Sequence, residues 1–268
     1  MTYLAPSHMD LQYTLAGFVV AFIIGLTGVG GGSLMTPILV ILFSIKPAVA
    51  VGTDLLYAAI TKGSGVLVHQ RRGNVDWAVV GLLACGSIPA TLLSLYLLRQ
   101  LEHAGVDYDH LITVMLSIAL ILTSSVLLFK NPLYRLSLNE SFDAVRALHR
   151  RARTPMTIIA GALIGLLVTF SSVGAGALGA AILFFLYPRR KAITIVGTDL
   201  AHAVPITAIA GLGHAQLGTV NYPLLFSLLL GSLPGIYLGS HTGARLPERV
   251  MRPLIAVMLF SVGVRMVV

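Results

Sequence analysis

Long apolar runs separated by short polar stretches fill almost the whole chain. A helix that crosses the hydrocarbon core needs about 20 apolar residues, because each residue rises 1.5 Å. Runs of this length cover residues 47–69, 76–98, 110–129, 192–214, 220–240 and roughly 250–268. The pattern predicts an all-α, polytopic membrane protein.

Two further apolar regions are interrupted by glycine and other small residues. One break is Gly28–Gly32 and the other is Ser171–Gly176. The arms of the first region reach only about 20–24 Å at helical rise. Glycine clusters permit sharp backbone bends. We therefore expect two hairpins of short helices, with second arms that start near Ser33 and Ala177, whether they cross fully or re-enter.

The chain is internally duplicated. The segment Val51–Leu55 recurs as Val196–Leu200, 145 positions later. The same offset matches His69 with His214, Gly86–Ser87 with Gly231–Ser232 and Pro89 with Pro234. We predict a first transmembrane repeat over residues 1–129, a basic cytoplasmic linker over 130–155 and a second transmembrane repeat over 156–268.

The basic residues predict how the chain is threaded. If each broken pair returns to its starting side, three further crossings follow in each repeat, and the repeats are inverted. This arrangement puts 14 Lys and Arg on one side and three on the other, whereas single crossings would give 9 against 8. Basic loops favour the cytoplasm. We expect both termini, and the loop with Glu102, Asp107 and Asp109, to be extracytoplasmic.

Composition agrees with a membrane protein and excludes other classes. Hydrophobic residues make up 56% of the 268 residues, charged residues make up 10%, and the formal net charge is +8. These values exclude a soluble globular enzyme, a disordered chain and a disulfide scaffold. Nucleic acid is not an expected partner, because the basic residues lie between apolar stretches. The first ten residues lack Lys and Arg, so we read no cleavable signal peptide there.

Inverted repeats with broken helices are typical of secondary transporters. Non-helical backbone within a bilayer must face protein or water, and free N–H groups at a helix start attract anions. We therefore predict a small anionic substrate near the midplane. The predicted substrate-binding glycines and serine are Gly30, Gly31, Gly32 and Ser33 in the first break and Gly174 and Gly176 in the second. The alternative is that these glycines only allow close helix packing.

Three residues are candidates for proton coupling. Asp54 and Asp199 occupy equivalent places inside two predicted spans, and acids within a membrane are functional candidates. Either could take up a proton that accompanies the anion, or could simply accept hydrogen bonds from hydroxyl or backbone groups. His202, one turn after Asp199, could share its proton or could be a packing residue.

Three further residues are candidates for substrate binding. Lys62 could attract an anion, or its ammonium group could reach the interface; a direct pair with Asp54 is not expected. Thr53 and Thr198 could donate to a bound oxyanion or bond their own helix. His69 and His214 fall at helix ends, where we expect the membrane interface.

These motifs resemble the TauE/SafE family of membrane transporters, in the toluene sulfonate uptake permease superfamily. The resemblance is carried by Gly25–Pro37 and Ala48–Asp54, and by Ser172–Gly176 and Val196–Asp199 as a second copy. It implies a bacterial-type inner-membrane transporter of sulfite or organosulfonates, with the glycine breaks and Gly-Thr segments along the substrate path. Two features depart from the family pattern: the second break lacks a full glycine triplet, and many members carry a neutral hydroxyl residue in place of Asp54 and Asp199.

The leading prediction is a secondary exporter of sulfur-containing anions coupled to the proton gradient. A passive anion channel or facilitator of the same architecture is the alternative. An intramembrane enzyme is not expected, because Ser171, Ser172, His202 and Asp199 show no recognisable catalytic spacing. Neither a cofactor nor a metal site is predicted. The bilayer and protons are the other expected partners, and a homo-oligomer is possible.

Overall fold

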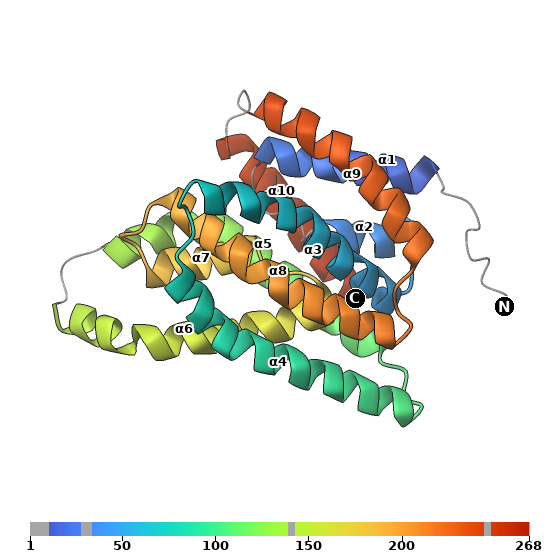
Figure 1. Ribbon diagram of the computed structural model, residues 1–268, viewed down its shortest axis with the longest axis horizontal. Helices are drawn as coiled ribbons and strands as arrows, with labels where there is room; N and C mark the ends of the chain where they lie inside the picture. The colour runs from blue at the N-terminus through green and yellow to red at the C-terminus, as the bar shows by residue number, and fades with distance from the viewer. Residues whose placement is uncertain (1–10, 28–33, 139–142, 244–247, 268) are drawn as a thin grey trace.

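The computed structural model describes residues 11–27, 34–138, 143–243 and 248–267, and it is helical throughout these ranges apart from short connections (Figure 1). The helices are α1 (Leu11–Thr27), α2 (Met35–Ile41), α3 (Pro47–Arg71), α4 (Trp77–His103), α5 (Asp109–Leu138), α6 (Asp143–Ser171), α7 (Ala177–Leu186), α8 (Ala192–Gln216), α9 (Tyr222–Gly243) and α10 (Glu248–Val267). The predicted all-α, polytopic architecture is confirmed.

Within the described residues, five helices are long and apolar enough to cross a membrane. They cover Trp77–His103, Asp109–Leu128, Ala152–Ser171, Ala192–Gln216 and Tyr222–Gly239. Shorter apolar helices cover Leu11–Ile23, Ala177–Leu186 and Ala256–Met266. The helix α3 has 25 residues and carries two buried charges, Asp54 and Lys62.

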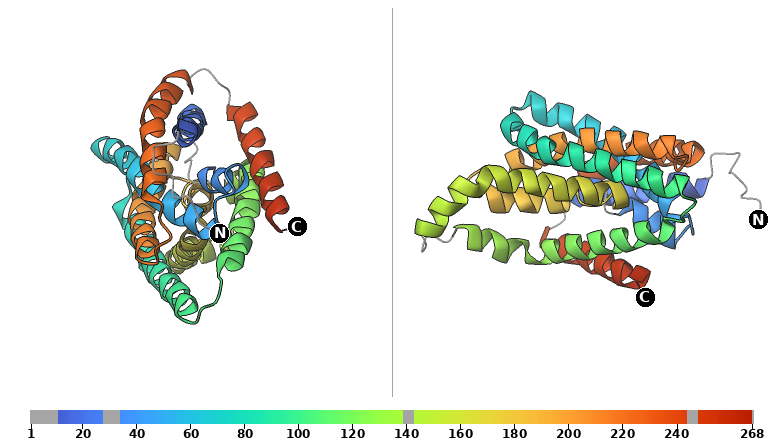
Figure 2. Two further views of the ribbon diagram at one scale, coloured as in Figure 1. Left: turned by 90° about the vertical axis from the view of Figure 1, so that its right-hand side faces the viewer. Right: turned by 90° about the horizontal axis from the view of Figure 1, so that it is seen from below.

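Much of the predicted linker is helical. The helix α5 continues to Leu138, and α6 begins at Asp143, so the basic segment extends two helices rather than forming a separate loop. Its Arg, Ala and Leu residues are strong helix formers. In the right-hand view of Figure 2 these two helix ends project beyond the other helices.

The second break has the predicted position. The helix α6 ends at Ser171, and α7 begins at Ala177. Ser172, Gly174 and Gly176 have positive φ angles of 57°, 123° and 137°, a region that favours glycine. The first break, including Gly30, Gly31, Gly32 and Ser33, lies outside the described residues.

Helix pairing is reciprocal between the two halves. The helix α1 packs on α9, and its equivalent α6 packs on α4, while α3 packs on α8 and α5 on α10. A Cβ atom on Gly86 would collide with the Ile158 carbonyl oxygen, and one on Gly231 would collide with the Thr14 carbonyl oxygen. Glycine thus allows equivalent helix pairs to approach backbone to backbone.

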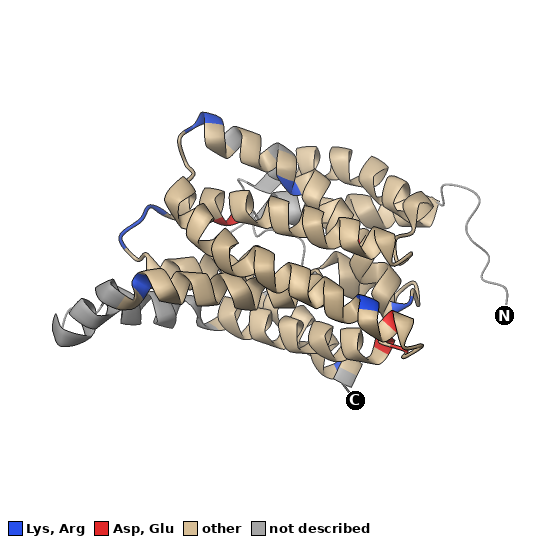
Figure 3. Ribbon diagram, turned by 60° about the horizontal axis from the view of Figure 1, so that its bottom comes forward, with Lys and Arg blue, Asp and Glu red and all other residues tan. Residues whose placement is uncertain are grey.

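The central helices α3 and α8 run antiparallel. The start of α4 bonds to the first turns of α8, through Asp76 and Thr198, and the start of α9 bonds to the first turns of α3, through Asn221 and Thr53. The connections α3–α4 and α7–α8 therefore share one end of the bundle. Lys and Arg gather in these connections, whereas the acidic α4–α5 connection lies at the opposite end (Figure 3).

Candidate functional site

The site is organised by three buried charged residues on α3 and α8. Asp54, Lys62 and Asp199 are 0%, 7% and 3% exposed, and they are the only buried Asp, Glu, Lys or Arg side chains that the structure describes. Charged groups within a membrane protein are costly unless they are paired or functional. The antiparallel packing of α3 on α8 brings the two halves of the chain together around these residues.

The Asp54 carboxylate contacts α2 and the second break. The Thr36 hydroxyl donates a hydrogen bond to Asp54 Oδ2. The Ser172 hydroxyl lies near this carboxylate, but no hydrogen bond joins them. Asp54 Oδ1 has no hydrogen-bond partner among the described residues. One of the two carboxylate oxygens is therefore bonded and the other is available.

The Asp199 carboxylate lies against the start of α7. Its Oδ1 atom occupies the place that a Cβ on Gly179 would need, so α7 approaches α8 closely because residue 179 has no side chain. Asp199 Oδ1 has no hydrogen-bond partner among the described residues. Within the described residues the equivalents Asp54 and Asp199 thus differ, because only Asp54 receives a hydroxyl hydrogen bond there.

The Lys62 ammonium reaches from α3 to the second break. Its Nζ donates to the Ala175 carbonyl at 2.8 Å. No ion pair links it to Asp54 or Asp199 in the described part of the chain, yet its charge acts on both carboxyls. An ammonium group has three donors, so this interaction leaves two available. Lys62 is buried rather than extended to the interface, and the absence of a direct pair with Asp54 agrees with the spacing.

His202 has a different partner from the one considered in the sequence. Its Nε2 is 2.8 Å from the Ser87 hydroxyl of α4, and no hydrogen bond joins it to Asp199 within the described residues. Its Nδ1 has no partner there. Tyr57 stands at the equivalent position of α3, lies near Ser232 of α9, and has an unpartnered hydroxyl among the described residues.

Most of the buried polar side-chain atoms without a hydrogen-bond partner among the described residues belong to this site. Among the described residues they include Oδ1 of Asp54, Oη of Tyr57, Oγ of Ser172, Oδ1 of Asp199 and Nδ1 of His202. Buried polar groups are normally hydrogen-bonded to protein or water. We call these five residues and Lys62 the central polar cluster. Such a cluster is suited to a polar ligand that is bound only part of the time.

Thr53 and Thr198 hold the two halves together. Thr53 Oγ1 accepts the Asn221 backbone N–H at 3.0 Å, and Thr198 Oγ1 accepts the Asp76 backbone N–H at 3.0 Å. Thr198 also donates to the Thr194 carbonyl at 2.6 Å. These contacts engage both hydroxyl oxygens, so they give no support to substrate binding by either threonine.

His214, near the end of α8, is fully buried within the protein. Its Nε2 lies 3.0 Å from the Thr169 carbonyl and its Nδ1 lies 2.9 Å from the Thr219 hydroxyl. Both ring nitrogens are therefore occupied, and we assign His214 to structure. The end of α8 is covered here by the α6 helix and the α8–α9 connection.

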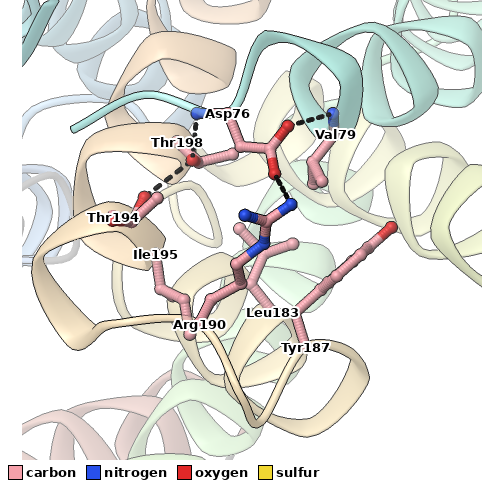
Figure 4. A pocket seen from close by; sticks show the side chains of 8 residues that line it. All are labelled: Asp76, Val79, Leu183, Tyr187, Arg190, Thr194, Ile195 and Thr198. Atoms are coloured by element: carbon pink, nitrogen blue, oxygen red, sulfur yellow. Dashed lines mark hydrogen bonds and ion pairs between the residues drawn. The ribbon is translucent and has the colours of Figure 1, made fainter. Parts of the chain in front are cut away.

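A small pocket lies at the basic end of the bundle. It is lined by Asp76, Val79, Leu183, Tyr187, Arg190, Thr194, Ile195 and Thr198 (Figure 4). The Arg190 guanidinium crosses it to the Asp76 carboxylate at 2.7 Å. Asp76 Oδ1 also accepts the Val79 N–H at 3.4 Å at the start of α4. The polar residues of this pocket thus mainly link the α3–α4 connection to the α7–α8 connection.

Sequence reasoning missed several members and neighbours of the site. Tyr57, Thr36 and Ser87 are fully or almost fully buried, yet in the sequence they resemble ordinary residues of apolar helices. The usable signal was the repeat, because Tyr57 is the counterpart of His202. Gly174 and Gly176, which were predicted, form the bend that presents Ser172 and the Ala175 carbonyl. The described residues include no group of three or more His, Cys, Asp or Glu placed to hold a metal ion.

Comparisons with known proteins place this sequence among membrane transporters. The sequence model of one family, described as Sulfite exporter TauE/SafE, matches residues 13–266. The probable membrane transporter protein YjnA of Bacillus subtilis is 35% identical over 97% of this chain and 100% of its own length. Another from Bacillus subtilis, YdhB, is 28% identical over 90% of this chain and 93% of its own length. No solved structure gives a match.

Proposed function

Because the chain belongs to the TauE/SafE sulfite exporter family and is a membrane transporter, we propose that it carries small sulfur-containing anions of the sulfite or organosulfonate type. The proposed direction is export, and the transport is coupled to the proton gradient. We also propose that it lies in the inner membrane, with both termini outside the cytoplasm, and that it is not an enzyme.

The observation that carries this proposal is the central polar cluster. It combines one buried ammonium, Lys62, with donor groups on Tyr57 and Ser172 that have no partner among the described residues. A sulfite or sulfonate group presents several oxygen acceptors on a small anion. The second break supplies polar backbone at the same place, and such backbone within a membrane must face protein or a water-filled path.

The antiparallel halves support alternating access. Equivalent helices pack reciprocally, and α3 and α8 cross the bundle in opposite directions. We propose that the repeats are inverted in the membrane, so that the binding site lies where they meet. Asp54 and Asp199 then lie on equivalent helices at this place, and their burial favours a role in proton uptake.

The test is accumulation in proteoliposomes. Purified protein would be reconstituted and offered radiolabelled sulfite or methanesulfonate, with chloride as the control anion and protein-free vesicles as the blank. A pH gradient with the acidic side outside should drive the sulfur anion above its external concentration, and a gradient of the opposite direction should not. Collapse of the gradient with a protonophore should return the anion to equilibrium. Chloride should not accumulate.

A passive facilitator remains the second candidate, because a path lined by the same cluster could conduct anions without coupling. The accumulation experiment separates the two. A facilitator would equilibrate sulfite across the vesicle membrane but would never concentrate it when only a pH gradient is imposed. If no sulfur anion enters the vesicles, with or without a pH gradient, both candidates are contradicted.

A further inference from the structure

The central polar cluster has an uneven charge balance. It contains two carboxyl groups, Asp54 and Asp199, and one ammonium group, Lys62. If both carboxyls were ionised, the cluster would keep one uncompensated negative charge inside the bilayer, which is costly. A single proton shared by the two carboxyls makes the cluster neutral.

The surrounding elements do not change this balance. Tyr57 and His202 are the other titratable groups that these charges reach. The remaining neighbours in the described part of the chain are neutral: Thr36 from α2, Ser87 from α4, Ser172 and the Ala175 carbonyl from the second break, and Ser232 from α9. If Tyr57 and His202 stay neutral, the cluster balances any added charge with its two carboxyl groups.

An anion that enters the neutral cluster needs a counter-ion. The Lys62 ammonium can act as that counter-ion only if the carboxylate that compensated its charge becomes protonated. This requires a second proton. The loaded cluster then holds two protonated carboxyls, the Lys62 ammonium and one singly charged anion, and it is again neutral. A doubly charged anion would leave one negative charge uncompensated.

The donors around Lys62 suit an oxyanion. Lys62 uses one N–H on the Ala175 carbonyl and keeps two others. The Tyr57 and Ser172 hydroxyls, which have no partners among the described residues, can add O–H donors. A sulfonate or bisulfite group could accept from all of these at once.

We propose that the site loads one singly charged oxyanion together with one proton, with Lys62 as the counter-ion of the anion, and that it excludes doubly charged anions. This inference rests on the proposed function. It makes each transport cycle electrically neutral. Transport therefore depends on the concentration gradients of the anion and of the proton but not on the membrane potential, and export removes one proton with each anion.

The first experiment compares two anions whose charge does not change in the neutral pH range. Methanesulfonate carries one negative charge and sulfate carries two. In proteoliposomes with the wild-type protein, the ratio of internal to external methanesulfonate should rise about tenfold for each pH unit by which the outside is more acidic. One coupled proton requires this ratio. A potassium potential set with valinomycin at equal pH should not drive it. Sulfate flux should be at least about a hundredfold slower, since it would leave a buried charge.

The second experiment uses variants of the cluster. Asp54→Asn and Asp199→Asn should each keep coupling, because an amide replaces the resident proton and one titratable carboxyl remains. The double variant should lose coupling and should carry methanesulfonate in response to the valinomycin potential. Lys62→Met should reduce methanesulfonate flux by more than about tenfold, whereas Lys62→Arg should retain it. Size-exclusion profiles in detergent would report on folding of each variant.

Several outcomes overturn the inference while leaving the proposed function intact. These are methanesulfonate flux driven by membrane potential in the wild-type protein, sulfate flux equal to methanesulfonate flux, or full flux in a folded Lys62→Met variant. Should the double variant not fold, the wild-type measurements still decide. Absence of flux for every anion would instead reject the proposed function, and this inference with it.

Discussion

The Asp76 carboxylate pairs with the Arg190 guanidinium at 2.7 Å and so ties the α3–α4 connection to the α7–α8 connection. The equivalent of Asp76 in the second half is Asn221, which cannot form an ion pair. Asn221 Oδ1 accepts the Leu224 N–H at 3.0 Å, just as Asp76 Oδ1 accepts the Val79 N–H. The repeat thus supplies a natural variant in which the helix cap is kept and the charge is absent.

We expect Asp76→Asn to lower stability by no more than about 1 kcal/mol, because the Arg190 side chain is 58% exposed and exposed ion pairs contribute little. Asp76→Ala should cost about 1 kcal/mol more, since it also removes the cap of α4. Thermal unfolding in detergent would measure both. Equal losses for the two variants would show that the cap contributes nothing.

Thr53→Val and Thr198→Val should each destabilise the protein by about 1–3 kcal/mol, because each leaves a backbone N–H of the other half without its acceptor. Thr→Ser at either position keeps the oxygen and serves as the matched control. The two valine variants should behave alike in denaturation experiments. A large effect at one position with none at the other would contradict the reciprocal role.

Gly86→Ala and Gly231→Ala should destabilise the protein by about 1–3 kcal/mol or more, because the added methyl group meets a carbonyl oxygen of the neighbouring helix. Gly81→Ala on the same helix α4 is the control. No atom lies within 4 Å of a Cβ at residue 81, and alanine is the better helix former. Its melting temperature should therefore be unchanged or higher. Similar losses at all three positions would argue against specific close packing.

Cysteine labelling checks the orientation predicted from the basic residues. Cys85 is exposed and would first be replaced by serine. Val106→Cys, in the α4–α5 connection, should react with a membrane-impermeant maleimide on intact cells. Arg189→Cys, in the α7–α8 connection, should react only after the membrane is permeabilised. The reverse pattern would place the basic connections outside.

The sequence was sufficient to predict the all-helical architecture and the second break. Hydropathy and helical rise give the length of each span, and glycine gives the bend. The partners of the site residues were not predictable. Thr53 bonds to a residue 168 positions away, and His202 to one 115 positions away. Hydropathy along a helix does not specify which helix faces which, so Ser87 and Thr36 carried no distinguishing signal.

The residues that fasten the halves and the residues that bear charge are immediate neighbours. Thr53 precedes Asp54, and Thr198 precedes Asp199. If one half rotates against the other and the hydrogen bond between Thr53 and Asn221 breaks, Asp54 must move too, because it is joined to Thr53 by the backbone. In each half, the threonine that bonds to the other half and the adjoining buried aspartate therefore move together.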